Sequence, residues 1–234
     1  ITFRLSGGFS PVGMIPTGEN PPESLNVIIE VPVGGEPVKY EFDKASGALF
    51  VDRILHTPMR YPANYGFVPH TLSPDGDPLD ALVVARSPFV PGSVVRCRPI
   101  AVLNLEDEAG GDEKLLCVPD DKTFPYYANV KEKEDLPDII AQQVEHFFTH
   151  YKDLEKDKWV RVGTWGDADD ARLDFNVGAS AYKAGKFEAA ATAFATWQKT
   201  TPAERPQRIT RSRGGLNRLP HGHSPSSGRS ASSG

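Results

Sequence analysis

The chain of 234 residues has few cysteines and no long apolar run. Its two cysteines, Cys97 and Cys117, lie in apolar, strand-like segments, and a disulfide framework would require more of them. We therefore expect two buried free thiols, which favours a reducing compartment and a cytoplasmic protein. No apolar stretch approaches the ~20 residues of a membrane helix, so we expect no membrane partner.

The two ends of the chain differ from its middle. The chain does not begin with Met, and residues 1–13 lack the continuous apolar core of a signal peptide. We expect these residues to be an extension, with Met14 as the natural beginning. Everything after Glu204 contains six Arg and no acidic residue. Residues 203–234 have almost nothing to bury, and their composition predicts a disordered basic tail.

Acidic charge dominates the remainder. The net charge is −5, but residues 1–204 carry 20 Lys and Arg against 31 Asp and Glu. An acidic body argues against nucleic acid as the main partner. The hydrophobic content of 39% is that of a globular protein.

Short strands outnumber helices in the expected fold. Ile140, Val144, Phe147, Phe148 and Tyr151 recur at helical spacing and predict one long amphipathic helix. This pattern favours a mainly β (α+β) fold, a small barrel with flanking helices, over a doubly wound sheet. The predicted strands are Val27–Val31, Val38–Phe42, Leu49–Arg53, Leu79–Ala85, Val94–Leu103, Leu115–Val118 and Trp159–Val162.

Two acidic turns carry the strongest chemical signal. The first, Asp75–Asp80, holds three carboxylates in six residues, and the second runs from Asp107 to Asp112 just before Lys114. Such carboxylates repel one another, and hard cations such as Mg²⁺ bind them. Solvated turn chemistry is the alternative for the first turn taken alone. An EF-hand is excluded because its spacing requires Gly and Glu where Asp80 and Arg86 stand.

Polar residues also interrupt the predicted strands. Lys39 and Glu41 fall on one face of a strand, while Glu30 and Arg53 stand in otherwise apolar segments. Each alone is compatible with a solvated sheet face. Together with the acidic turns they predict the wall of a polar cavity, with a polyanionic ligand bound by metal and side chains.

These segments resemble the soluble family I inorganic pyrophosphatases of the bacterial type. The resemblance rests on EFDKASGALFVDR, YPANYGFVPHTL, DGDPLDALV, the hairpin from PGSVVRCRPIAVL to EDEAGGDEK, and HFFTHYKDLEKDKWV, and it runs from about Pro16 to Trp165. It implies a five-stranded closed OB-like β-barrel flanked by helices. It also implies Mg²⁺-dependent hydrolysis of inorganic diphosphate to two phosphates, and a homo-oligomer, a hexamer by family resemblance.

The resemblance also assigns individual residues. It implies metal ligands Asp75, Asp80, Asp112, Asp107 and Glu30, with several Mg²⁺ per site. It implies phosphate-binding groups Lys39, Arg53, Tyr65, Lys114, Tyr151 and Lys152, of which Arg53, Tyr65 and Lys152 are also counted as catalytic. Glu41, Tyr61 and Glu108 align with supporting positions. Asp77 is left to accept or orient the proton of the attacking water.

The role of one histidine pair and the function itself have alternatives. His146 and His150 stand four residues apart, the spacing of a metal pair. The resemblance implies that the corresponding helix lies at a subunit contact, and this role is favoured. A non-catalytic metal-bound scaffold that presents a C-terminal helix hairpin to a partner is the rival function, although such a scaffold would not need the complete set of charged residues. Hydrolysis of another phosphoanhydride, such as a nucleoside triphosphate, is disfavoured because no Gly-rich phosphate loop is present.

The expected organisation has a pyrophosphatase domain at 14–172 and a change of pattern after Arg172. Residues 173–202 resemble one tetratricopeptide-type helical hairpin, with Gly185 in the turn and Pro202 at the close. One repeat cannot bury its own apolar face. We therefore expect it to dock on the domain or to be a fusion or frameshift product, rather than to recruit a partner.

Overall fold

The computed structural model describes residues 11–43, 46–108 and 110–199. The predicted basic tail at 203–234 and most of the predicted N-terminal extension lie outside the described residues. None of the helices in the described part of the chain is long and apolar enough to cross a membrane.

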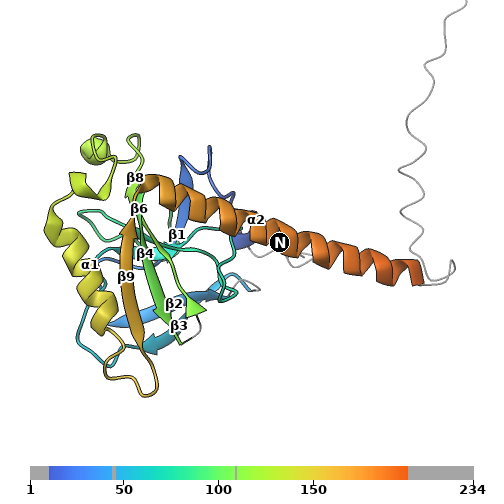
Figure 1. Cartoon of the computed structure of the whole chain (residues 1–234), viewed down its shortest axis with the longest axis horizontal. Coiled ribbons are helices and arrows are strands. Elements are labelled where there is room, and N and C mark those ends of the chain that lie inside the picture. The colour runs from blue at the N-terminus through green and yellow to red at the C-terminus, as the bar shows by residue number, and fades with distance from the viewer. Residues whose placement is uncertain (1–10, 44–45, 109, 200–234) are drawn as a thin grey trace, which may run out of the picture. The chain divides into compact units, whose positions relative to one another are not determined.

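A ring of five strands forms the centre of the fold, in the order β1-β4-β5-β8-β6 and back to β1 (Figure 1). These strands are β1 (Leu25–Val31), β4 (Asn64–Phe67), β5 (Asp80–Val83), β6 (Val94–Asp107) and β8 (Lys114–Pro119). All neighbours are antiparallel except β5 and β8. Closure removes the exposed sheet edges that would otherwise be open to pairing. The predicted closed barrel is confirmed.

The long strand β6 closes the ring because it pairs with both β8 and β1. Its first half pairs with β1 and β8, and its second half pairs with β8 and with β9 (Val160–Gly166). Register shifts between Pro99 and Ala101 and between Leu103 and Leu105 bend the strand. The short β7 (Gly110–Gly111) pairs with its end, at the second acidic turn.

Both faces of the barrel strands are buried. In β1, Leu25, Val27 and Ile29 belong to one apolar cluster, and Ile28, which points to the other face, belongs to another. This two-sided burial explains why the strands read as nearly continuous apolar runs. Cys97 and Cys117 are buried free thiols in these strands, as predicted.

A separate hairpin, β2 (Val38–Asp43) with β3 (Ala48–Ile54), stands beside the ring and carries Lys39 and Arg53. The predicted amphipathic helix is confirmed as α1 (Asp138–His150), which buries Val144, Phe147 and Phe148 and lies beside β9 (Figure 1). The 3₁₀ turns are η1 (Pro11–Met14), η2 (Pro125–Tyr127) and η3 (Lys133–Asp135).

The predicted helical hairpin at 173–202 is wrong over the residues that the structure describes. One helix, α2, runs from Ala168 to Lys199 without a turn. Gly185 was expected in the turn, but a single Gly costs a helix only about 1 kcal/mol relative to Ala, and the surrounding sequence is rich in Ala. The first turns of α2 pack on the barrel instead of on a second helix, through Ala171 and Phe175.

Candidate active site

A polar cavity opens between the ring and the β2–β3 hairpin. Its volume is about 50 Å³. The residues that line it are Glu30, Lys39, Glu41, Tyr65, Phe67, Asp77, Pro78 and Asp80. Four separate segments of sequence therefore meet here, including the strand face of Lys39 and Glu41 and the first acidic turn. This part of the predicted polar wall is present, whereas Arg53 and the second acidic turn do not line the cavity.

Glu30 is the most deeply buried acid of this cavity, with 5% of its surface exposed. The backbone N–H of Phe42 donates a hydrogen bond of 2.9 Å to its Oε1 and thereby attaches the β2–β3 hairpin to β1. Burial raises the pKa of Glu30 to about 8, and the carboxylate of Asp80 adds to the effect. A cation entering the cavity would favour the charged form of Glu30.

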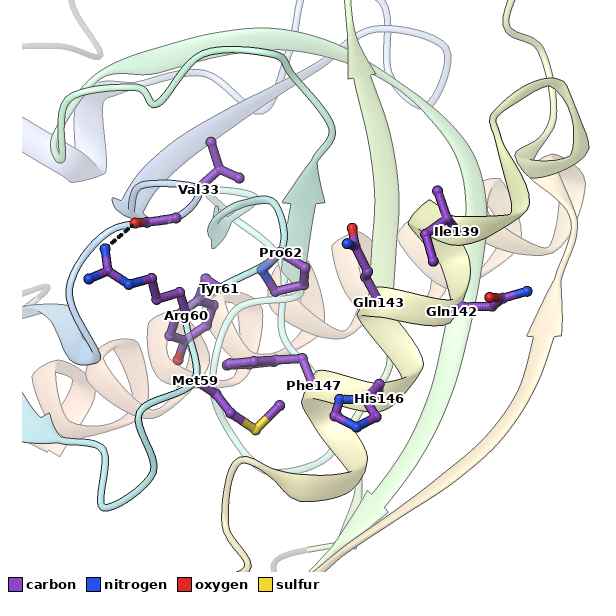
Figure 2. Close-up of a pocket in the computed structure, with 11 residues that line it drawn as sticks. Val33, Met59, Arg60, Tyr61, Pro62, Ile139, Gln142, Gln143, His146 and Phe147 are labelled. Atoms are coloured by element: carbon purple, nitrogen blue, oxygen red, sulfur yellow. Dashed lines mark hydrogen bonds between the residues drawn. The ribbon is translucent and has the colours of Figure 1, made fainter.

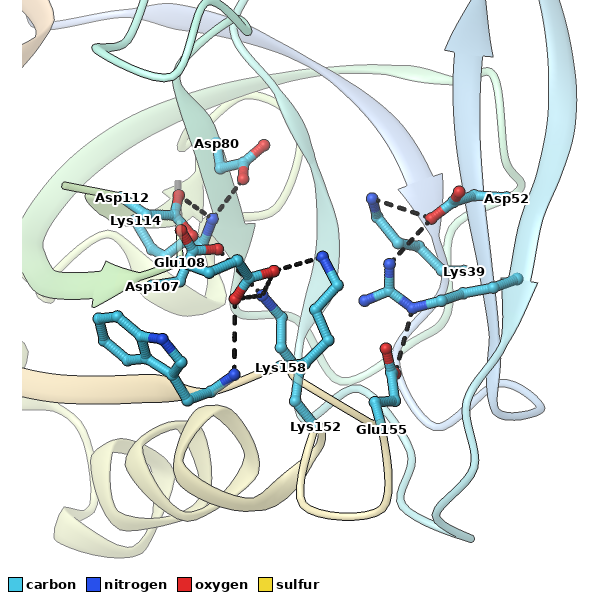
Figure 3. A network of polar contacts seen from close by, with 12 residues as sticks. Lys39, Asp52, Asp80, Asp107, Glu108, Asp112, Lys114, Lys152, Glu155 and Lys158 are labelled. Atoms are coloured by element: carbon cyan, nitrogen blue, oxygen red, sulfur yellow. Dashed lines mark hydrogen bonds and ion pairs between the residues drawn. The ribbon is translucent and has the colours of Figure 1, made fainter. Parts of the chain in front are cut away.

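Lys114 joins the two acidic turns. Its ammonium is buried and bonds to both Asp80 and Asp112 (Figure 3). Burial alone would lower the pKa of Lys114, but the two carboxylates outweigh it and hold the pKa above its usual range. The hydroxyl of Tyr65 donates a 2.5 Å hydrogen bond to Asp80. A cation and a neutral donor thus converge on one carboxylate.

A second cluster of ion pairs lies at the start of the second acidic turn, at Asp107 and Glu108. The Lys152 ammonium is 2.9 Å from Asp107 and 3.4 Å from Glu108, and Lys158 also bonds to Glu108 (Figure 3). Although burial opposes it, the hydrogen bond from Lys158 and the charge of Lys152 lower the pKa of Glu108 to about 2. Glu108 therefore stays ionised and fixes both lysines.

Arg53 and Lys39 share a carboxylate that the sequence analysis did not assign. Asp52 lies 3.2 Å from each of them, and the Nε of Arg53 lies 3.2 Å from Glu155 (Figure 3). Glu155 and Lys158 were also missed. Their signal was the charged run that follows Lys152, but their partners are distant in sequence, so spacing could not reveal the pairs.

The first acidic turn holds its remaining carboxylates outward. Asp75 and Asp77 are exposed, and Asp75 Oδ1 accepts a 3.0 Å hydrogen bond from the Asp77 N–H. Gly76 between them has φ +92°, a conformation that favours glycine. The structure places Asp77 at the cavity, whereas Asp75 is bonded to its own turn.

Aromatic rings form a layer beneath these charges. The ring of Tyr61 lies 5.2 Å from that of Tyr65 and 4.6 Å from that of Phe147, which stacks on Tyr151 at 5.1 Å. Burial raises the pKa values of Tyr61, Tyr65 and Tyr151, so their hydroxyls stay protonated, and that of Tyr65 donates to Asp80. Glu41 is held to Lys39 at 3.6 Å. The structure therefore brings every predicted site residue to this region, with Asp75 at its exposed edge.

The donor set fits a hard divalent cation by its chemistry. Among the described residues, no three His, Cys, Asp or Glu side chains are arranged to enclose one ion. Asp80 and Asp112 nevertheless share a cation, the Lys114 ammonium, and carboxylate oxygens are the donors that Mg²⁺ prefers. These carboxylates match Mg²⁺ in charge and donor type.

A larger cavity, of about 610 Å³, lies away from these charges beside α1 (Figure 2). Met59, Pro62 and Phe147 give it an apolar wall, and Gln142 and His146 of α1 border it. None of the predicted ligands of metal or phosphate lines this cavity, although the supporting residue Tyr61 does. The rings of His146 and His150 lie 4.8 Å apart, and His150 bonds to Asp153 at 2.8 Å.

Comparison with known proteins shows the family to which the chain belongs. The profile described as inorganic pyrophosphatase matches residues 27–183. The chain belongs to the inorganic pyrophosphatase family. The match continues past Arg172 into α2, beyond the expected domain end.

Individual relatives agree with this assignment. The inorganic pyrophosphatase of Mesorhizobium japonicum is 62% identical over 154 residues, 66% of this chain and 87% of the relative. That of Bradyrhizobium diazoefficiens is 59% identical over 160 residues, 68% of this chain and 90% of the relative. A crystal structure described as an inorganic phosphatase of Anaplasma phagocytophilum superposes with a TM-score of 0.70 at 50% identity, over 71% of this chain and 98% of that one.

Proposed function

We propose that the polar cavity bounded by Asp77, Asp80 and Lys39 hydrolyses inorganic diphosphate to two phosphates with Mg²⁺. The observation that carries the proposal is the alternation of acidic and basic side chains, from Glu30, Lys39 and Asp80 in the cavity to the ion pairs of Lys114 and Lys152 with the second acidic turn. The reaction class, inorganic diphosphatase (EC 3.6.1.1), follows from the family match and from relatives about 60% identical. The family requires a divalent metal.

The carboxylates would hold the metal ions. Asp75, Asp80 and Asp112 are the proposed ligands of the most tightly bound ion, with Asp80 also reaching a second. Asp107 with Asp112 would hold another, and Glu30 would act through water. When bound, Mg²⁺ lowers the pKa of water and neutralises charge on the phosphates.

The basic residues would bind the diphosphate. Lys39, Arg53, Lys114 and Lys152 are already oriented by carboxylates, so a diphosphate can replace or share these partners through charge-assisted hydrogen bonds. The role of Asp52 and Glu155 would be to hold Arg53 in place. Tyr65 and Tyr151 would supply neutral donors, and Glu41, Tyr61 and Glu108 would support the residues that bind the diphosphate. Phosphoryl transfer depends mostly on such positioning and electrostatics.

Asp77 is the proposed proton acceptor. It lines the cavity beside Asp80, and its exposed carboxylate can approach a water molecule that attacks phosphorus. General-base assistance of this kind contributes about 10²–10⁴-fold to a rate. Asp77 therefore accepts or orients the water proton, while its neighbours hold the metal.

Phosphate release from diphosphate in the presence of Mg²⁺ tests the function. Beside the wild-type chain, the assay includes Asp80→Ala and a parallel measurement with ATP. Fast Mg²⁺-dependent release from diphosphate, absent in Asp80→Ala and slow with ATP, is the expected result. A folded wild-type chain that releases no phosphate would contradict it and would favour the non-catalytic scaffold; faster release from ATP would favour the nucleotide substrate.

We also infer a homo-oligomer, a hexamer by family resemblance, that works in the cytoplasm. The partly apolar cavity beside α1, bordered by His146, supports a subunit contact there. The buried free thiols support a reducing compartment. Light scattering on the full chain measures the oligomer, and a monomer at micromolar concentration would contradict the inference.

A further inference from the structure

The helix α2 contacts the loop that joins β4 to β5 and carries the first acidic turn. The N–H of Leu72 donates a 3.1 Å hydrogen bond to the carbonyl oxygen of Gly178. A Cβ on residue 178 would lie 3.4 Å from Leu72 O and 3.6 Å from the Cβ of Thr71. A Cβ at residue 178 would make ordinary van der Waals contact with the loop, so the loop packs directly on this turn of the helix.

One turn farther along α2, Tyr182 supports the start of the same loop. Its hydroxyl lies 3.0 Å from Nδ1 of His70, and the two rings meet edge to face with centroids 5.3 Å apart. His70 has φ +60°, a left-handed conformation that is unusual for a residue with a side chain. Such a conformation is maintained when surrounding contacts hold it.

Hydrogen bonds connect these two contacts to the backbone of the first acidic turn. Thr71 is buried, and its hydroxyl donates to Val68 O at 2.7 Å and accepts from Leu79 N at 2.9 Å, which fixes the base of the loop. Next to Leu72, Ser73 N donates to Asp77 O at 2.7 Å. The series of contacts from α2 to Asp77 therefore passes through adjacent residues of one small loop.

We propose that the Phe175–Tyr182 part of α2 is a positioning element for the carboxylates of the first acidic turn, with Gly178 and Tyr182 as its positioning residues. Neither residue lines the polar cavity, so both act through the loop. The proposal rests on the proposed function, because it concerns Asp75 and Asp77 as the metal-binding and proton-accepting groups. It assigns this role to a segment whose sequence resembles a tetratricopeptide hairpin.

Mg²⁺ binding is the property that such positioning affects most. Mg²⁺ demands near-ideal octahedral geometry, so a displaced carboxylate weakens binding more than it weakens the fold. The expected signature is a lower Mg²⁺ affinity with little change in thermal stability. A contact that only stabilises the protein would change the melting temperature and leave Mg²⁺ affinity unchanged.

The conservative variant Tyr182→Phe keeps the ring contact and removes the hydroxyl. We measure Mg²⁺ binding calorimetrically on the full chain without diphosphate, and then the Mg²⁺ concentration that gives half-maximal diphosphate hydrolysis. Both are expected to weaken about threefold, as the loss of one hydrogen bond implies, with turnover at saturating Mg²⁺ close to wild type. Tyr126→Phe, an exposed tyrosine in η2, is the matched control and should leave both values unchanged.

A double-mutant cycle with His70→Gly isolates the contact. Glycine tolerates φ +60° and removes the partner of Tyr182, so Tyr182→Phe should have no further effect on Mg²⁺ binding in that background. Unchanged Mg²⁺ affinity in Tyr182→Phe, or an equal loss in both backgrounds, would overturn the proposal. A wild-type chain that binds Mg²⁺ without hydrolysing diphosphate would overturn the proposed function instead, and the calorimetric comparison would still test α2.

Discussion

The two acidic turns carry similar charge but stabilise it in different ways. In the first turn, Asp75 and Asp77 are exposed, and backbone hydrogen bonds together with α2 determine the shape of the loop. In the second, the side chains of Asp107 and Asp112 are only 14% and 16% exposed, and each bonds to a buried lysine. Water screens Asp75 and Asp77, whereas buried lysines neutralise Asp107 and Asp112, and Lys114 also neutralises Asp80 at the end of the first turn.

This difference separates catalysis from stability. Exposed charges in water interact weakly, so changing one costs little folding free energy. Part-buried carboxylates that lose a cationic partner cost much more. We therefore expect substitutions of Asp75 and Asp77 to affect mainly turnover and metal binding, and substitutions in the second turn to affect the free energy of unfolding as well.

The largest expected effect is in the first turn. Asp77→Asn should lower turnover by about 10²–10⁴-fold, because the amide cannot accept the water proton. Phosphate release measures turnover, while calorimetry and thermal melting should show Mg²⁺ affinity and stability near wild type. Asp138→Asn, an exposed aspartate in the first turn of α1, is the control. Turnover unchanged in Asp77→Asn would remove Asp77 from proton handling.

The next largest effect is expected on stability, at Lys114, which bonds to a carboxylate of each turn. Lys114→Met should lower the free energy of unfolding by about 3 kcal/mol without Mg²⁺, because Asp80 and Asp112 lose their shared buried cation. Added Mg²⁺ should restore part of this loss. Urea unfolding measures both values.

The matched control for Lys114 is Lys158→Met. Lys158 is 43% exposed in its ion pair with Glu108, so its loss should cost at most about 1 kcal/mol. Equal losses for the two lysines would mean that burial does not distinguish the turns.

Much of the barrel could be predicted because its strands are rich in β-branched residues. The strand β4 was missed since Asn64, Tyr65 and Gly66 do not form such a run. Gly66 is nevertheless required, because a Cβ there would lie 1.9 Å from Ile28 O on the neighbouring strand. That need arises from strand pairing and has no local pattern.

The candidate site could be predicted where its residues lie in dense local motifs, as in the two turns. The ion pair between Arg53 and Glu155 could not be predicted, because the two residues lie 102 positions apart along the chain. The helix α2 was read as a hairpin from its small residues. Gly178 instead contributes its carbonyl oxygen, which accepts the N–H of Leu72 in the loop, a contact that leaves no local pattern in the sequence.

The smallest expected effect compares one glycine from each turn. Gly76 has φ +92° and Gly110 has φ +128°, and an added Cβ at either position would have nothing within 4 Å. Alanine should therefore cost about 1 kcal/mol or more at each position, from backbone strain alone. Gly76→Ala should also weaken Mg²⁺ binding, because the backbone determines where Asp75 and Asp77 point. In Gly110→Ala the ion pairs of Lys114 and Lys152 should keep Asp112 and Asp107 in place, so Mg²⁺ affinity measured by calorimetry should hold. Equal weakening in both variants would show that backbone shape positions the carboxylates of the second turn as well.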